Sequence, residues 1–444
     1  MKGKIVRRPR ARLRLLGAVT VAGLAAGTLA ACGGGAEASG GTPTLTWYIN
    51  PDGGGSDPHG GGQVQIAAEC TKAANGKYRI AFEQLPNSAS DQRTQLLRRL
   101  AAGDPSMDIM SVDPAFITEF AAADYFAPVP KDMVKEFTED RVQSALDASK
   151  YKGKLIAVPF WANTQVLWYR KSVADKAGLD MSKPVTWQQL IDAAQKTDTT
   201  IGVQAALYEG YSVWINALIE GAGGHIVDNQ NATYEHIKLG LDSEAGRKAA
   251  EIIRKVADTG VGGPAVGSSQ ETQSLNLFQG KSSGFLVNWP YVYAALKAAK
   301  VPWMDDLGFT KYPKTVPDHP SAPPFGGIEI AVGKNTQHPD LAYEAAACIT
   351  SEEHQVDYMV ATGNPASRKQ AFNDPKVKEA FPNGLAALIR ESLDQAATRP
   401  LSPYWGDIST ALQQRFSPPD QVGPKTPAKA QEFILDVLNG KALL

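Results

Sequence analysis

Aromatic, amide and charged side chains recur where the sequence predicts that strands end, and these residues are suited to bind a polar ligand. They are Asn50, Asp52, Asp113, Trp161, Asn163, Glu209, Glu271, Trp289 and Arg399. The C–H face of a pyranose ring packs on a flat indole, whereas its hydroxyls pair with carboxylates, amides and a guanidinium fork. Because hydrogen bonds to charged groups contribute roughly 1.5–3 kcal/mol each, a few carboxylates could select one sugar.

Each of these residues also has a purely structural interpretation. Asn and Asp commonly end strands and cap helices, and a tryptophan also packs in a core or between lobes. For Trp161, packing beside a hinge explains the residue as well as ligand contact does. The group of residues at one predicted sheet edge therefore carries more weight than any single member.

Known catalytic motifs are missing from the sequence. The six histidines have no metal-ligand spacing, and neither an HExxH motif nor a G-x-S-x-G elbow occurs. Gly280-Lys281-Ser282 resembles the end of a phosphate-binding loop, but Leu275 stands where that loop requires glycine. We therefore expect a protein without a cofactor, a metal site or catalytic residues. Paired carboxylates have no sequence signature, so an extracellular glycosidase remains the alternative from another class.

The first 31 residues predict a lipoprotein signal peptide. Basic residues open the segment: Lys2, Lys4, Arg7, Arg8, Arg10, Arg12 and Arg14. An apolar stretch over 15–31 follows, and Leu29-Ala30-Ala31-Cys32 is typical of a bacterial lipobox. We expect cleavage before Cys32, lipidation of that cysteine and anchoring to the outer face of the cell membrane. An ordinary cleaved signal peptide is the alternative. Residues 32–44 then form the lipidated cysteine and a flexible Gly/Ser-rich tether.

Charge and cysteine content agree with export. Removing seven basic residues from the 45 of the whole chain leaves 38 against 46 acids, a net charge of −8. That balance argues against nucleic acid and against a polybasic membrane surface. Cys70 and Cys348 remain as an even pair in an oxidising compartment, so we expect a disulfide, with two buried free thiols as the alternative.

The order of predicted elements indicates an α/β protein. Strands are expected over 45–49, 78–85, 108–112, 202–206, 284–287 and 328–332. Helices are expected over 64–74, 88–103, 114–122, 187–194, 213–220, 245–257, 271–278, 291–298 and 342–350. Alternating strands and helices near the N-terminus predict a parallel sheet, and ligands bind beyond the carboxyl ends of such strands. A length of 444 residues favours two lobes.

Three links are predicted to carry the chain between the lobes. The first is Pro159 to Gln165, where a proline and polar residues separate two apolar runs; the others are near 324–328 and 363–366. Lobe 1 would comprise 45–160 and 328–362, and lobe 2 would comprise 163–325 and 366–444. Discontinuous lobes joined by several links make a hinge that could close on a ligand.

Several stretches give the chain a family resemblance. They are Gln92-Arg93 with Arg98-Arg99-Leu100, 108–113, Asn163-Thr164-Gln165-Val166-Leu167-Trp168-Tyr169-Arg170, Val287-Asn288-Trp289-Pro290, Gly326-Gly327 and Arg399-Pro400. With the lipobox and two lobes, they resemble the extracellular sugar-binding proteins of ABC importers, the group that includes maltodextrin-binding protein. Within that group, they are most similar to trehalose-binding lipoproteins. The resemblance spans the mature chain, and the two remaining cysteines match the family's pair.

The resemblance implies a fold, a function and a set of binding residues. The fold would be periplasmic-binding-protein-like, and a monomer would capture a disaccharide, trehalose by preference, for an ABC permease. Maltose or sucrose are alternatives, and so is a sensory role beside a membrane kinase. The implied ligand residues are Asp113, Asn163, Glu271, Trp289, Gly327 and Arg399. The first loop is longer than expected, so its acid could be Asp52 or Asp57, of which we favour Asp52.

Overall fold

The structure, a computed structural model, describes residues 41–51, 59–230, 232–280 and 282–444. The predicted signal peptide, Cys32 and most of the predicted tether lie outside these residues, as do Asp52 and Asp57. Residues 42–444 form one compact unit. Among the described residues, no helix is both long and apolar enough to cross a membrane.

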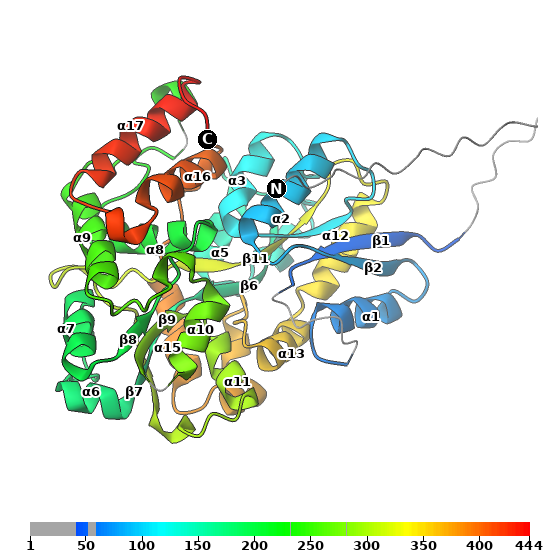
Figure 1. Ribbon diagram of the computed structural model, residues 1–444. Coiled ribbons are helices and arrows are strands. Elements are labelled where there is room, and N and C mark those ends of the chain that lie inside the picture. The colour runs from blue at the N-terminus through cyan, green and yellow to red at the C-terminus, as the bar shows by residue number, and fades with distance from the viewer. Residues whose placement is uncertain (1–40, 52–58, 231, 281) are drawn as a thin grey trace, which may run out of the picture. The chain divides into compact units, whose positions relative to one another are not determined.

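Helices and strands alternate from Thr44 to Ala122, and the elements described after Val332 are helices (Figure 1). To residue 170 they are β1 (Thr44–Ile49), α1 (Gln63–Ala73), β2 (Arg79–Gln84), α2 (Ala89–Ala101), β3 (Ile109–Val112), α3 (Pro114–Ala122), α4 (Val134–Thr138), α5 (Gln143–Ala148), β4 (Lys150–Tyr151), β5 (Lys154–Leu155), β6 (Val158–Thr164) and β7 (Val166–Arg170). To residue 332 they are α6 (Lys171–Ala177), α7 (Trp187–Thr197), β8 (Thr200–Gly202), α8 (Glu209–Glu220), α9 (Glu244–Asp258), α10 (Glu271–Gln279), β9 (Ser283–Asn288), α11 (Tyr291–Ala298), β10 (Leu307–Thr310) and β11 (Phe325–Val332). The rest are α12 (Pro339–Ile349), α13 (Glu352–Thr362), α14 (Pro375–Ala380), α15 (Leu385–Asp394), α16 (Trp405–Phe416) and α17 (Thr426–Leu438).

Within the described residues, two larger sheets carry the lobes. The five-stranded sheet has the order β2-β1-β3-β11-β6, in which β1, β2 and β3 are parallel and β11 is antiparallel to both neighbours. The four-stranded sheet has the order β10-β7-β9-β8. The predicted two-lobed α/β architecture is confirmed, and so is the parallel pairing of the first three strands.

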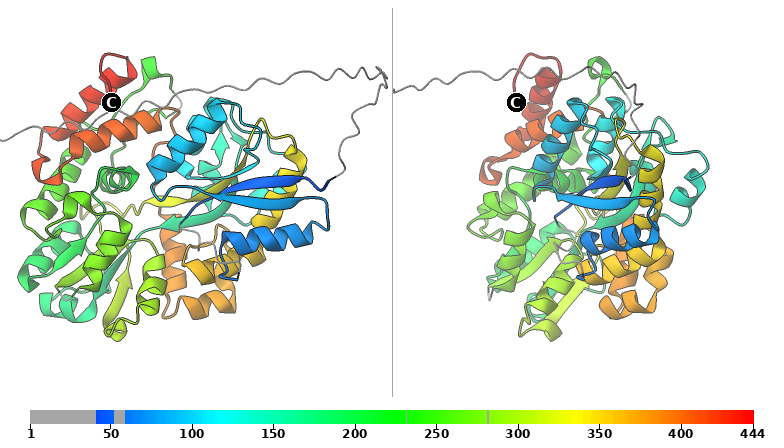
Figure 2. Two further views of the ribbon diagram at one scale, coloured as in Figure 1. Left: turned by 45° about the vertical axis from the view of Figure 1, so that its right-hand side comes forward. Right: turned by 90° about the vertical axis from the view of Figure 1, so that its right-hand side faces the viewer.

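Helices cover both faces of the five-stranded sheet because its inner strands are buried on both sides, whereas the edge strand β2 is largely exposed. On β1, Trp47 packs in the same apolar cluster as residues of α1 and α12, whereas its neighbour Tyr48 packs with residues of α2 and α3. Figure 2 shows the C-terminal helices α16 and α17 lying together beside α8 and α9, and α16 also contacts α3. The C-terminal segment therefore reaches elements that flank both sheets.

The chain passes from one sheet to the other at Gln165, between β6 and β7. Pro159 was expected to end the first strand, and this expectation was wrong, because β6 runs through it to Thr164. Proline lacks an N–H, and here it lies at the register shift beside Ile328 and Glu329, where the ladder is already interrupted.

Two other local expectations were wrong. The strand expected over 202–206 ends at Gly202, because the N–H groups of Ala205 and Ala206 donate to the Ser269 carbonyl instead of a strand. The glycine of Glu209-Gly210-Tyr211 predicts a loop, but these residues form the first turn of α8. Gly210, which favoured a loop, has a packing role: a Cβ there would lie 2.1 Å from the Tyr208 hydroxyl.

The predicted disulfide is confirmed. The sulfur atoms of Cys70 and Cys348 are 2.04 Å apart, and the bond joins α1 to α12 across 278 residues of sequence. Its cross-link holds together two helices that already pack side by side.

A buried carboxyl group lies in the middle of the five-stranded sheet. Glu329 on β11 is fully buried, and its Oε2 atom accepts a hydrogen bond of 2.6 Å from the Ser149 hydroxyl. Burial raises the pKa of Glu329 to about 8, although Ser149 and the charge of Arg141 oppose the shift. The folded protein therefore keeps a proton on this residue at pH values where the unfolded chain has released it.

We predict that Glu329 makes folding stability fall as the pH rises. A carboxyl with a raised pKa in the folded state contributes stability that is present below its unfolded pKa of roughly 4.3 and lost as the pH passes the folded value. The free energy of unfolding of Glu329→Gln should thus rise relative to that of the wild type by about 3.5 kcal/mol as the pH increases from about 5 to about 8. Denaturant titration across this range measures the effect, with the exposed Glu379→Gln as control. Parallel pH profiles for wild type and Glu329→Gln would contradict it.

Candidate ligand-binding site

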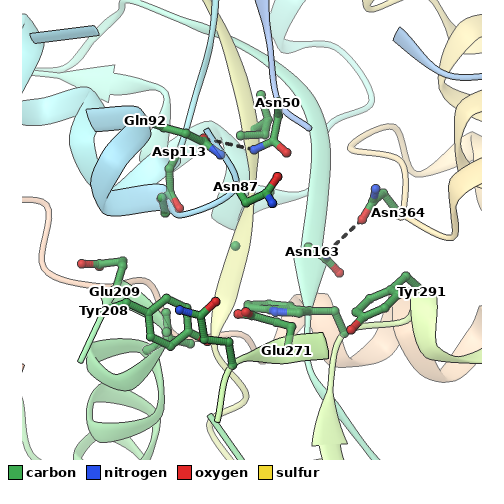
Figure 3. A pocket seen from close by; sticks show the side chains of 18 of the residues that line it. Asn50, Asn87, Gln92, Asp113, Asn163, Tyr208, Glu209, Glu271, Tyr291 and Asn364 are labelled. Carbon is green, nitrogen blue, oxygen red and sulfur yellow. Dashed lines mark hydrogen bonds between the residues drawn. The ribbon is translucent and has the colours of Figure 1, made fainter. Parts of the chain in front are cut away.

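One cavity of about 550 Å³ is lined by every predicted site residue that the structure describes. These residues are Asn50, Asp113, Asn163, Glu209, Glu271, Trp289, Gly327 and Arg399. Figure 3 shows two groups of labelled side chains facing each other across the space: Asn50, Gln92 and Asp113 on one side, and Tyr208, Glu209 and Glu271 on the other. The cavity volume is within the range of small-molecule sites.

Asn50 and Asp113 reach the cavity because each directly follows a strand of the five-stranded sheet. Asn50 follows β1 and its Nδ2 atom donates to Oε1 of Gln92 at 3.2 Å. Gln92 is fixed in turn because its Nε2 atom donates to the Pro86 carbonyl at 2.8 Å. Asp113 follows β3 and caps α3, where Oδ1 accepts from the Ala115 N–H at 2.9 Å. Both residues thus have structural roles as well as places in the cavity wall.

A buried guanidinium group joins two carboxylates across the cavity wall. The Nη2 atom of Arg399 donates to Oδ1 of Asp113 at 2.7 Å, and its Nη1 atom donates to Oε1 of Glu209 at 2.8 Å. The side chains of Arg399 and Glu209 are each 4% exposed. Burial alone would lower the pKa of Arg399, but the two carboxylates raise it, so the cation is held firmly charged.

Glu209 is held by α16 as well as by Arg399. The indole N–H of Trp405 donates to its Oε1 atom at 2.9 Å, and the Ser409 hydroxyl donates to its Oε2 atom at 2.5 Å. Burial raises the pKa of Glu209, and the Arg399 charge opposes that shift. A C-terminal helix therefore positions an acid from the first turn of α8.

Two adjacent glycines of β11 let aromatic and backbone groups approach the cavity. A Cβ at Gly326 would lie 3.0 Å from the Trp289 ring, so the indole rests directly on the strand. Gly327 has φ +127°, and a Cβ there would lie 2.2 Å from the Trp161 carbonyl oxygen. Only glycine combines that backbone conformation with so close a contact.

Glu271 and Asn163 complete the predicted set. Glu271 begins α10, and burial raises the pKa of its carboxyl, while hydrogen bonds from Tyr208 and Trp289 oppose the shift. Asn163 lies near the end of β6; its Oδ1 atom accepts from the Thr164 N–H at 3.0 Å, and its Nδ2 atom donates to Asn364 at 3.4 Å. The amide thus lies where the five-stranded sheet meets the segment after α13.

Trp161 packs against a helix and also faces the cavity. It lines the cavity, and its ring also stacks on Tyr358 with centroids 4.9 Å apart and planes 28° from parallel. Packing against α13 accounts for its burial, and its place in the cavity lining also allows a ligand contact.

Other cavity residues were not singled out as ligand residues. They are Asn87, Gln92, Tyr208, Gln270, Gln273, Tyr291, Thr362 and Asn364. Most come from loops and helix starts whose neighbours are set by long-range packing. Asn364 offered the best signal, because it follows Gly363 at a predicted link between lobes.

The described residues contain one group with the spacing of metal ligands, formed by Cys70, Cys348 and His354. Both thiols are consumed in the disulfide, so the group offers one imidazole and carries no metal site.

An α/β protein with two lobes and a polar cavity lined by both sheets has the architecture of a binding protein that encloses small solutes. The chain belongs to the bacterial extracellular solute-binding proteins, because the sequence profile of that family matches residues 57–356. A probable ABC transporter-binding protein of Deinococcus radiodurans is 25% identical over 336 residues, which cover 71% of this chain and 76% of that protein.

Two further likenesses involve proteins named for sugars. A maltotriose-binding protein of Pyrococcus abyssi is 22% identical over 369 residues, covering 81% of this chain and 76% of that protein. The solved structure of maltose-bound MalE3 of T. maritima has a TM-score of 0.76 and 21% identity, covering 90% of this chain and 100% of that one. This structural likeness confirms the periplasmic-binding-protein-like fold.

We predict that Arg399→Met lowers the free energy of unfolding by about 3 kcal/mol, because Glu209 would stay buried without its cation. The double variant Arg399→Met/Glu209→Gln should recover part of that loss. Urea denaturation of the ligand-free wild type, of Arg399→Met, of Glu209→Gln and of the double variant completes the double-mutant cycle. Arg247→Met is the matched control, since it removes a half-exposed partner of Asp242 and should cost less than about 1 kcal/mol. Equal losses in both arginine variants would contradict the assignment.

Proposed function

We propose that this protein captures an α-linked disaccharide, with trehalose as the favoured ligand, and delivers it to an ABC permease. One observation carries the proposal: an indole and a carboxylate–guanidinium–carboxylate array share a single cavity. Trp289 offers a stacking face for a sugar ring, and Asp113, Glu271 and Arg399 offer partners for hydroxyls. Membership of the extracellular solute-binding family supports capture, and relatives named for maltose and maltotriose support a sugar.

Support for trehalose comes from the sequence stretches that resemble trehalose-binding lipoproteins, above all Asn163 to Arg170 and Val287 to Pro290. Maltose and sucrose are the alternatives that share the same stacking and hydroxyl chemistry. Lipidation at Cys32 would keep the protein beside its permease at the outer face of the membrane, and the proposal treats it as a monomer.

The charge pairing in the cavity favours binding over hydrolysis. A glycosidase needs one carboxyl as acid and a second that can attack or activate water. Asp113 and Glu209 instead share one guanidinium, which takes one oxygen atom of each, and the Ser409 hydroxyl takes the second oxygen atom of Glu209. Glu271 would then stand without a catalytic partner in the proposed site.

The first test screens sugars by thermal shift. Trehalose should raise the melting temperature more than maltose, sucrose or glucose, because a ligand that binds only the folded state stabilises it by RT ln(1 + [L]/Kd). The same samples should release no glucose after prolonged incubation. A shift with maltose or sucrose alone would replace the ligand, and steady release of glucose would replace the function with that of a glycosidase.

The second test removes the proposed contacts. Trp289→Ala should weaken sugar binding by well over tenfold, roughly 1.5 kcal/mol or more, because stacking area is lost. Asp113→Ala should do the same by losing hydroxyl and Arg399 contacts. Because Asp113 also caps α3, Asp113→Asn is compared with it, since Asn keeps the cap.

Isothermal titration calorimetry measures both affinities. Trp303→Ala is the control for loss of an indole, since Trp303 packs on Phe278 and lies outside the cavity lining. Unchanged affinity in Trp289→Ala would remove that residue from the proposed site.

A further inference from the structure

A network of hydrogen-bonded, buried polar side chains lies behind the cavity. It consists of Gln165, Gln204, Ser274 and Asn288, each at most 1% exposed. Gln165 lies where the chain passes between the sheets, and Asn288 immediately precedes Trp289. Burying a polar group costs free energy unless it is hydrogen-bonded, so the partners of these side chains indicate what the network holds in place.

Hydrogen bonds connect this network continuously from Gln165, between the two sheets, to the cavity. The Nε2 atom of Gln165 donates to Oε1 of Gln204 at 2.9 Å. Gln204 donates in turn to the Ser274 hydroxyl at 2.9 Å and to the Val287 carbonyl at 3.0 Å. The second sheet is thereby tied to α10 and to the link between the lobes.

Asn288 joins the backbones of two proposed ligand residues. Its Nδ2 atom donates to the Glu271 carbonyl at 3.1 Å and to the Ser274 hydroxyl at 3.2 Å. Its Oδ1 atom accepts from the Trp289 N–H at 2.8 Å. Because a peptide carbonyl can only accept and a peptide N–H can only donate, these partners determine which way the amide points.

The side chain required at 288 is therefore narrowly defined. It must donate in one direction and accept in the other, which an amide does at any pH. A carboxylate accepts only, and an aliphatic side chain does neither. Removal of either bond would free the first turn of α10 or the residue that carries the indole.

We infer that Asn288 is a positioning residue for the ligand: it fixes the Glu271 carboxyl and the Trp289 indole relative to each other without touching the sugar. The inference rests on the proposed disaccharide function. Ser274 accepts hydrogen bonds from both Asn288 and Gln204. Gln204 in turn accepts from Gln165, so the network links Asn288 to the point where the polypeptide passes between the sheets.

The test compares three variants at position 288 and at its neighbour 274. Asn288→Leu should weaken disaccharide binding by about tenfold or more at every pH, since both bonds are lost. Asn288→Asp should show a similar loss at about pH 8 and recover most of it at about pH 5, because a protonated carboxyl has an O–H donor and a carbonyl acceptor. Ser274→Ala, a milder change, should weaken binding about threefold.

Controls separate positioning from folding. Ser283→Ala removes an equally buried hydroxyl from β9 that has no hydrogen-bond partner in the described part of the chain, and it should bind as the wild type does. Glu271, whose backbone carbonyl accepts from Asn288, is itself titratable, so each affinity is divided by the wild-type value at the same pH. Circular dichroism and thermal unfolding of the ligand-free proteins identify any variant that fails to fold, in which case Ser274→Ala against Ser283→Ala decides.

The outcomes distinguish this inference from the function on which it rests. Wild-type protein that binds none of the disaccharides overturns the proposed function and the inference together. Wild-type binding with folded variants that match it, or an Asn288→Asp variant without pH-dependent recovery, overturns the inference alone. A pH-dependent loss confined to Asn288→Asp, with the constant loss in Asn288→Leu, supports it.

Discussion

The cavity depends on one buried cation. Asp113 and Glu209 come from helix starts that lie far apart in sequence. Two ionised carboxylates would repel each other in this buried part of the cavity lining unless a positive charge lay between them. Arg399 supplies that charge with a planar fork whose two ends reach one acid each. The pairing has a structural consequence beyond electrostatics: it requires the loop before α16, the end of β3 and the start of α8 to meet at one point.

The second constraint is steric. Gly326 and Gly327 remove side chains from the strand on which Trp289 and the Trp161 backbone lie. The cavity is thus bounded by a flat indole, a stretch of β11 without side chains and a charged array. A site built on strand ends and helix starts costs little entropy when a ligand enters, because its side chains are already held by neighbours.

Local sequence patterns predicted the strand-end residues well for a physical reason. Parallel strands place their carboxyl ends at one edge, so Asn50 and Asp113 could be grouped before any coordinates were known. The same reasoning misplaced the ends of elements. Pro159 indicated a strand end but lies at a register shift, and Gly210 indicated a loop but gives room to Tyr208. The strand expected over 202–206 stops early, because the N–H groups of Ala205 and Ala206 donate to a loop carbonyl. Burial and packing decided these cases, and neither is a local property.

The sequence by itself determined the family, the α/β class, the disulfide partners and the types of residue in the cavity, because each follows from composition, short-range pattern or a long matching stretch. Tertiary structure alone decided which acids share Arg399, that Trp405 and Ser409 hold Glu209, and that Asn288 spans Glu271 and Trp289. These contacts join residues up to 286 positions apart, and their geometry arises only when two sheets and the C-terminal helices pack together.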